Sequence, residues 1–319
     1  HRSRQEQQTG ETERPIRHSF SLRGETVELY GRMDAFTDGP TPLVEEMKLS
    51  RHTGDAPLPE HRAQALLYAA MAALEEERPS VEFCVTYLNL EGAVLRRFSE
   101  TLSREELAAQ AESWLDRWLD FALREREHRR QRDASIRTLD FPFPAYRPGQ
   151  RALAGEVYRA CTAAPSKSGV RLFCQAPTGI GKTMSVLFPA LRAIGTGCGE
   201  KLFYLTARNT TQSAAEDAIA RLRASDPKLA LRSVTLTAKE KVCLHPDAEG
   251  HPACLPELCP YANGYYDRVN TALKALLDDD TGRFDRAALA DAAKQFTVCP
   301  FELGLDLSEW CDVIIGDYN

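Results

Sequence analysis

Apolar and polar residues alternate over much of the first hundred positions, as is typical of strands with one buried face. After Pro59 the apolar residues instead recur with helical spacing, which predicts a helix to about Glu77. The predicted elements are two strands within Arg17–Phe36 joined by a turn at Arg23–Glu25, a strand at Pro42–Lys48, the helix, and a strand pair at Val81–Leu88 and Val94–Phe98.

A capping box at Ser103, with Glu106 three residues later, predicts the start of the next helix. This helix leads into the basic segment 124–132, interpreted either as a solvated helix end or as a contact with DNA phosphates. Further along, a helix is predicted up to Cys161, and strands are predicted at Val170–Gln175, Lys201–Thr206 and Val234–Thr237. The domains expected from these patterns are a first domain at 1–132, a linker at 133–140, a second domain at 141–242 and 300–319, and an insertion at 243–299.

The composition is that of a globular protein of about two domains, at 319 residues. No apolar run approaches the roughly 20 residues of a membrane span, and no signal peptide is visible, so we expect no membrane contact. A net charge of -6 excludes a uniformly basic surface but leaves room for a local basic groove. The nine cysteines lack the spacing of a disulfide scaffold, which favours a reducing cytoplasm and possible metal ligands.

Two carboxylates and one lysine stand at the ends of neighbouring predicted strands. Asp34 ends the second strand, and the next strand carries Glu46 and Lys48 on one face because strand side chains alternate. Carboxylate oxygens bind hard divalent cations such as Mg²⁺ or Mn²⁺, and a lysine stabilises developing charge on a phosphate. Taken singly, such residues usually form a solvated face; together they predict a metal-dependent site.

The following helix carries Gln64 and Tyr68 four residues apart on one face. The ordered set Asp34, Glu46, Lys48, Gln64 and Tyr68 resembles the PD-(D/E)xK nucleases, specifically the RecB-type branch. The resemblance implies a restriction-endonuclease-like fold, with Asp34 and Glu46 as ligands of Mg²⁺ or Mn²⁺ and all five residues as the catalytic set. That branch also has an upstream histidine ligand, for which His18 is one candidate and a residue before the start of the chain is the other.

A phosphate-binding loop is predicted between the strand Val170–Gln175 and the helix that follows it. Gly179 and Gly181 allow backbone N–H groups to turn toward phosphate oxygens, Lys182 reaches the terminal phosphates, and the Thr183 hydroxyl can ligate Mg²⁺. The loop runs from Ala176 through Thr178 to Thr183, and Ala replaces the usual first Gly. We therefore expect ATP and Mg²⁺ at this loop, in the manner of helicases.

Polar residues beside the loop extend this resemblance. Arg147 and Gln150 form an aromatic-Arg-x-x-Gln group with Tyr146, which resembles the adenine-reading element of superfamily 2 helicases. The Gln amide can pair with both edge groups of adenine. At the end of a later strand, Thr206 and Arg208 occupy the position that contacts a single DNA strand in such helicases.

Four cysteines follow with irregular gaps of 10, 4 and 39 intervening residues: Cys243, Cys254, Cys259 and Cys299. The absence of a C-x-x-C pair makes a zinc ribbon a poor fit, whereas a 4Fe-4S cluster accepts irregular spacing. Four reduced core thiols and a zinc site are the alternatives. The other five cysteines are expected to be core or surface thiols.

The order of these features resembles the iron-sulfur DNA helicases of the XPD and DinG type, over roughly residues 140–319. The resemblance implies a partial RecA-like motor domain with a cluster insertion, ATP-driven 5' to 3' movement on single-stranded or forked DNA, and a role in DNA repair. No Asp-Glu dipeptide follows Thr183, so we expect the sequence to be the N-terminal part of a larger helicase-nuclease, without ATP hydrolysis of its own. The alternative is a single-stranded nucleic-acid-binding module with an inactive nuclease fold and a structural metal site.

Overall fold

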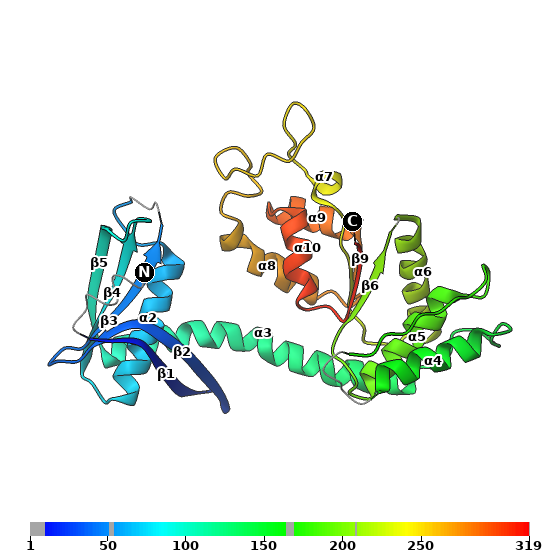
Figure 1. Cartoon of the computed structure of the whole chain (residues 1–319), viewed down its shortest axis with the longest axis horizontal. Coiled ribbons are helices and arrows are strands. Elements are labelled where there is room, and N and C mark those ends of the chain that lie inside the picture. The colour runs from blue at the N-terminus through cyan, green and yellow to red at the C-terminus, as the bar shows by residue number, and fades with distance from the viewer. Residues whose placement is uncertain (1–9, 51–53, 164–168, 208, 319) are drawn as a thin grey trace. The chain divides into compact units, whose positions relative to one another are not determined.

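The computed structural model describes residues 10–50, 54–163, 169–207 and 209–318 (Figure 1). The chain divides into two compact units, at residues 1–124 and 125–319, with one long helix, α3 (Arg104–Thr138), spanning the division. The sequence places the boundary a few residues later and a linker at 133–140, but helix continues to Thr138. It does so because Ile136 and Leu139 are fully buried in the core of the second unit.

Unit 1 is built on a five-stranded sheet of order β1-β2-β3-β4-β5. The strands β3 and β4 run parallel, since helix α2 crosses between them, and the other neighbours are antiparallel. The elements are β1 (Glu11–Leu22), β2 (Glu25–Thr37), β3 (Leu43–Leu49), α2 (Pro59–Glu75), β4 (Ser80–Leu88) and β5 (Val94–Ser103). All strands and helices predicted for this region are confirmed, with ends that differ by a few residues.

The core of unit 1 lies between one face of this sheet and the helix α2 (Figure 1). Apolar residues of alternate strand positions meet the alanine-rich face of α2, for example Phe83 and Met33 against Ala69. The predicted turn between β1 and β2 is made by Arg23 and Gly24, both with left-handed backbone angles. The capping box also forms, because the Ser103 amide donates to Glu106 and the Glu106 amide donates to the Ser103 hydroxyl.

Unit 2 contains a parallel sheet of order β6-β9-β7-β8. Its elements are α4 (Gln150–Thr162), α5 (Lys182–Gly195), β6 (Leu202–Thr206), α6 (Asn209–Ser225), β7 (Ser233–Thr235), α7 (Lys239–Val242), α8 (Tyr265–Leu277), β8 (Arg283–Phe284), α9 (Arg286–Phe296), α10 (Pro300–Ser308) and β9 (Val313–Asp317). The molecule is thus an α/β protein with one mixed and one parallel sheet. The two-residue strand β8 comes from the predicted insertion and joins the sheet beside β7.

The segment Val170–Gln175 departs from the prediction, because it is not a strand in this structure. The side chain of Phe173 is 93% exposed, and Val170 and Leu172 are exposed as well. A buried parallel strand needs a neighbour on each side to pair its backbone groups, and no strand of the described sheet pairs with this segment. Its apolar composition alone therefore does not place it in the sheet.

Helices α5 and α6 and the end of α3 form the core of unit 2 with strand β9. The apolar residues Leu187, Leu191 and Ile219 are fully buried there. None of the helices in the described ranges is long and apolar enough to cross a membrane.

Candidate functional site

The structure brings together the five residues predicted as a nuclease set in unit 1. Asp34 lies on β2, Glu46 and Lys48 lie on β3, and the Lys48 ammonium contacts Glu46 Oε1 at 2.7 Å. The Asp34 carboxylate accepts a hydrogen bond of 2.7 Å from the Met47 amide, which holds it against β3. The two acidic strands therefore present their carboxylates to one place, as strand alternation requires.

Helix α2 supplies the other two residues of this set. Lys48 Nζ donates to Gln64 Oε1 at 2.9 Å, and the Gln64 amide nitrogen lies 3.5 Å from the Tyr68 hydroxyl. Tyr68 in turn lies over Gly31, where an added Cβ would be 2.5 Å from its ring. A continuous hydrogen-bonded chain thus runs from Glu46 through Lys48 and Gln64 to Tyr68.

Burial changes the acidity of both carboxyl groups. Burial raises the pKa of Glu46 to about 7, and the Asp34 charge adds to this while the Lys48 hydrogen bond acts against it. Burial likewise raises the pKa of Asp34, opposed by the Met47 hydrogen bond and Lys48. These are acidic groups whose charged form lacks sufficient stabilisation from the protein alone.

One carboxylate oxygen of this site is buried without a hydrogen-bond partner in the described residues. The Glu46 side chain is 3% exposed, and within the described ranges its Oε2 atom has no hydrogen-bond partner. A buried, unsatisfied carboxylate oxygen costs about 1–3 kcal/mol or more. A divalent cation bound there would satisfy it, so the residues present fit a hard metal ion.

The upstream histidine expected from the nuclease resemblance is not found at this site. His18 lies on β1 and bonds through Nδ1 to Glu75 at 2.6 Å. Glu75 ends α2, eleven residues after Gln64, a separation of about 16 Å along a helix axis. Among the residues that the structure describes, no three His, Cys, Asp or Glu side chains are grouped closely enough to hold a metal ion.

The phosphate-loop residues of unit 2 lie at the start of α5. Gly179 and Gly181 both have left-handed angles, and helix α5 begins at Lys182, followed by Thr183. The Lys182 ammonium folds back over the loop and donates to the carbonyl oxygens of Ala176 at 2.9 Å and Pro177 at 3.4 Å. The lysine ammonium therefore bridges the loop at the N-terminus of α5. Backbone N–H groups at a helix N-terminus can bind an anion such as phosphate.

The predicted adenine reader contacts this loop instead of facing solvent. Gln150 is 3% exposed; its Oε1 accepts from the Arg147 amide at 3.0 Å and its Nε2 donates to Gly181 O at 3.3 Å. Arg147 donates to Gly179 O. Both ends of the Gln150 amide are thus occupied, so here it fastens the segment before α4 to the loop.

The structure does not show the two residues predicted to contact DNA on one exposed surface. Thr206 ends β6 as predicted, but it is 6% exposed and lies within 3.5 Å of Gly316 O on β9. Arg208 lies outside the described residues. Thr206 thus lies buried within the sheet in this structure, and its role as a DNA contact stays a prediction.

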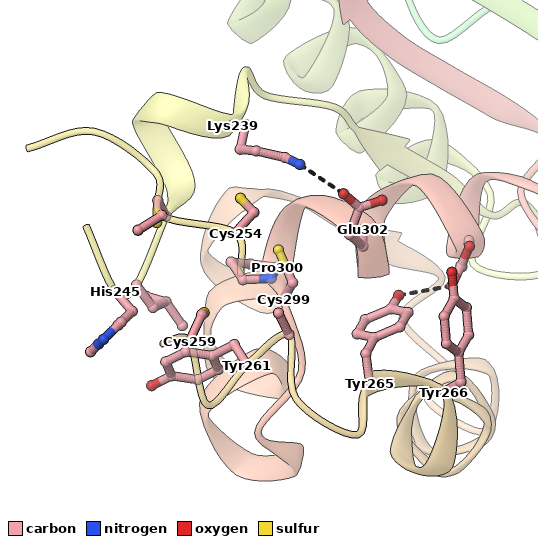
Figure 2. A pocket seen from close by; sticks show the side chains of 15 residues that line it. Lys239, His245, Cys254, Cys259, Tyr261, Tyr265, Tyr266, Cys299, Pro300 and Glu302 are labelled. Atoms are coloured by element: carbon pink, nitrogen blue, oxygen red, sulfur yellow. Dashed lines mark hydrogen bonds and ion pairs between the residues drawn. The ribbon is translucent and has the colours of Figure 1, made fainter. Parts of the chain in front are cut away.

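All four predicted cluster cysteines line one cavity of about 230 Å³, seen in Figure 2. Cys243 follows α7, Cys254 and Cys259 lie in the irregular segment before α8, and Cys299 precedes α10. Cys259 is buried, Cys254 is exposed, and burial raises the pKa of the Cys299 thiol. Four thiols spread over residues 243–299 thus line one cavity, although they are not gathered at ligand distance.

Polar pairs border the same cavity. Lys239 Nζ contacts Glu302 Oε1 at 2.8 Å, and the Tyr265 hydroxyl donates to Asp306 at 2.8 Å, as the dashed lines in Figure 2 mark. Burial and the Asp306 contact raise the pKa of Tyr265. These pairs tie α7 and α8 to helix α10, and so fix the walls on which the cysteines sit.

The other five cysteines follow the prediction. Cys84 and Cys311 are buried, Cys161 is half-buried, and Cys174 and Cys198 are exposed.

Comparison with known proteins provides little further information. No family model matches this chain, and no curated protein matches it. A solved structure, that of SSO0001, is similar over 32% of this chain and 48% of its own length, with 21% identical residues and a TM-score of 0.25.

Proposed function

We propose that this chain is part of an ATP-dependent DNA helicase of the iron-sulfur type, joined to a metal-dependent DNA nuclease that acts in DNA repair or processing. The observation that carries the nuclease half is the bonded chain from Glu46 to Tyr68, with one buried carboxylate oxygen lacking a partner. Most buried side-chain polar atoms in native structures have a partner, so this unpartnered oxygen supports a bound ligand.

In this nuclease each residue has a distinct role. Asp34 and Glu46 would hold Mg²⁺ or Mn²⁺, which when bound lowers the pKa of a ligand water and polarises the scissile phosphate. Lys48, fixed between Glu46 and Gln64, would donate a hydrogen bond to the attacking water or to the phosphate oxygen on which negative charge develops. Tyr68 holds Gln64 in place, and Gly31 leaves room for the tyrosine ring.

The ATP site of the proposal rests on the loop before α5. Thr178, Gly179 and Gly181 would offer backbone donors, and Lys182 would exchange its carbonyl contacts for phosphate oxygens. Thr183, the second residue of α5, would supply a hydroxyl to Mg²⁺. Arg147 and Gln150 support the loop from behind, and Gln150 reads adenine only if it releases Gly181.

A 4Fe-4S cluster is the proposed occupant of the cysteine cavity, held by Cys243, Cys254, Cys259 and Cys299. Thiolate ligands on a cluster need a reducing compartment, in agreement with a cytoplasmic protein. Single-stranded or forked DNA is the proposed partner of the whole chain.

The nuclease proposal is tested with labelled single-stranded DNA and Mn²⁺. Wild type should cut the strand, Lys48→Ala should lose about two orders of magnitude in rate, and the control Arg96→Ala, which changes an exposed cation of the same unit, should cut normally. If wild type and Lys48→Ala leave the DNA equally intact, the alternative takes its place: a single-stranded nucleic-acid-binding module with an inactive nuclease fold and a structural metal site.

The cluster proposal is tested by purifying the protein without oxygen. Wild type should be brown and contain iron, and Cys299→Ser should lose both colour and iron. The control Cys198→Ser removes an exposed thiol outside the set and should keep both. A colourless wild type that contains one zinc per chain contradicts the cluster and favours zinc.

A further inference from the structure

Helices α4 and α5 of unit 2 pack against each other and begin at the same end (Figure 1). At that end Gln150, the first residue of α4, donates at 3.3 Å to the carbonyl oxygen of Gly181, directly before α5. The two helices have nearly equal lengths of 13 and 14 residues. Because they start together and pack along each other, their C-terminal ends lie at one level as well.

One face of α4 is turned toward α5. The buried residues of α4 are Gln150, Ala154 and Val157, and Cys161 continues this row, because residues at i, i+4, i+7 and i+11 share one side of a helix. The row starts at the contact between Gln150 and Gly181, so it faces α5. Cys161 is half-buried and lies about 16 Å further along the helix axis than Gln150.

A second cysteine lies at the end of α5. Ala193 comes eleven residues after Lys182, the first residue of α5, so it is as far along α5 as Cys161 is along α4. The carbonyl oxygen of Ala193 accepts a hydrogen bond of 3.0 Å from the Cys198 amide. The chain after α5 thus folds back, with Gly197 in the left-handed region, and brings the exposed Cys198 to the level of Cys161.

The two thiols also influence each other electrostatically. Burial raises the pKa of the Cys161 thiol, and the negative charge of an ionised Cys198 raises it further. Because the interaction between two charges falls with their separation, this effect agrees with the close approach that the helix geometry indicates. Neither thiol lines the cavity of the proposed cluster, so a bridge between them leaves the four cluster cysteines available.

We propose that Cys161 and Cys198 form a reversible disulfide when the protein meets a peroxide, and that this bridge ties the C-terminal ends of α4 and α5 together. The position of both thiols at one level of two packed helices carries the inference. In a reducing compartment such a bridge is transient, as is typical of redox-sensing disulfides. The inference concerns unit 2 alone and does not depend on nuclease or helicase activity.

Hydrogen peroxide is the oxidant of the proposed reaction. The exposed Cys198, as the thiolate, attacks one peroxide oxygen; an S–O bond forms, the O–O bond breaks, and the hydroxide that leaves takes up the proton lost by Cys198. The Cys161 thiolate then attacks the Cys198 sulfur; the S–S bond forms, the S–O bond breaks, and the leaving hydroxide takes up the proton lost by Cys161. Two thiols and one peroxide thus give one disulfide and two waters, and the two sulfur atoms supply the two electrons that reduce the peroxide.

The bridge would hold α4 at both of its ends. Gln150 ties the start of α4 to the phosphate loop, and the disulfide would tie its last turn to the chain after α5. The stretch of chain between Cys161 and Cys198 includes the whole phosphate loop 176–183. A cross-link that closes such a stretch into a ring restricts the unfolded chain, so the oxidised protein should resist heat better than the reduced protein.

The experiment treats the full chain with hydrogen peroxide, blocks the remaining thiols with iodoacetamide and maps the peptides by mass spectrometry without reductant. Wild type should give two peptides joined through Cys161 and Cys198, lighter by two hydrogens than the separate peptides, and dithiothreitol should release them. The thermal midpoint should rise by roughly 5 °C or more on oxidation. This rise should be absent in Cys161→Ser and Cys198→Ser and present in the control Cys174→Ser, which changes another exposed thiol.

Each outcome of this experiment bears on the bridge. The joined peptides, with a rise of the midpoint only in proteins that carry both thiols, support it. The inference is wrong if Cys198 is converted to a sulfinic acid while Cys161 is alkylated, if Cys198 joins Cys174 instead, or if the joined peptides form without any rise of the midpoint. Cys198→Ser changes an exposed residue, so it tests the bridge even where Cys161→Ser does not fold.

Discussion

A buried charge network in unit 2 gives the sharpest test of how this fold is held together. Asp312, just before β9, is 2% exposed and accepts hydrogen bonds from Arg132 at 2.9 Å and from the Arg232 amide at 2.7 Å. Its other neighbour is His128 Nε2 at 2.9 Å. Because Arg132 and His128 belong to α3 and are themselves buried, this one carboxylate fixes the end of α3 to the parallel sheet.

Replacing Asp312 by Asn keeps the size of the side chain but removes the negative charge. Arg132 then remains buried without its main counter-ion, and breaking a buried pair in this way costs about 3–5 kcal/mol. Since 1.4 kcal/mol is a factor of ten, opening of this region should become about 10² to 10⁴ times more frequent. Glu309→Gln, an exposed neighbour, should change it by less than about twofold.

The buried thiol of Cys311, next to Asp312, reports this opening directly. Wild type and variant are labelled with iodoacetamide, and modification of the Cys311 peptide is followed by mass spectrometry. The neighbours of Asp312 hold its pKa low against the effect of burial, so the free energy of unfolding of wild type, measured by chemical denaturation, should also decline as pH falls below about 4. A less than fivefold rise in the Cys311 labelling rate of Asp312→Asn would refute the argument.

Three further predictions concern unit 1. Burial raises the pKa of Glu46 from 4.5 to about 7, so the protonated carboxyl stabilises the fold fully below about pH 4.5, and this stabilisation is lost as the pH rises through 7. The calorimetric unfolding midpoint of metal-free protein should therefore fall between pH 5 and 8, and it should fall less in Glu46→Gln. Gly31→Ala places a Cβ 2.5 Å from Tyr68, so it should lower the stability by about 1–3 kcal/mol and reduce DNA cleavage, whereas Gly39→Ala, with its nearest atom at 3.9 Å, should do neither. Ser103→Ala removes the cap of α3 and should cost about 1 kcal/mol in chemical denaturation; an unchanged midpoint would contradict the capping role.

Local patterns predicted most of the architecture. Alternation located the strands of unit 1, and the pair of Ser103 and Glu106 located the start of α3, because these signals depend only on residues close in sequence. The bonded chain from Glu46 to Tyr68 was located by strand alternation, helical spacing and the resemblance of the ordered set to the RecB-type nucleases.

The prediction that failed, and one contact that the sequence did not show, depend on partners far away in the chain. Val170–Gln175 is as apolar as a buried strand, but pairing is decided by neighbouring strands, and none in the described sheet accepts it. Gln150 has the right chemistry for adenine, and its role as adenine reader stays a prediction; in this structure its amide nitrogen donates to the carbonyl oxygen of Gly181, which spacing alone did not show. The spacing of residues in the sequence shows which side chains could take part in a site, but it does not show which distant residue each of them will contact.

The residues that sequence reasoning missed are of the same kind. Arg132 belongs to the basic segment 124–132, yet it is only 5% exposed and donates to Asp312. Asp312 lies in an apolar run of the sequence. Its burial is explained by the hydrogen bond from Arg132, which lies 180 residues earlier in the chain. Both are charged groups whose burial costs free energy unless a distant partner of opposite charge compensates it. In this protein, therefore, an unexpectedly buried charge indicates a long-range contact that no local motif shows, and the Cys311 labelling rate in Asp312→Asn tests that contact.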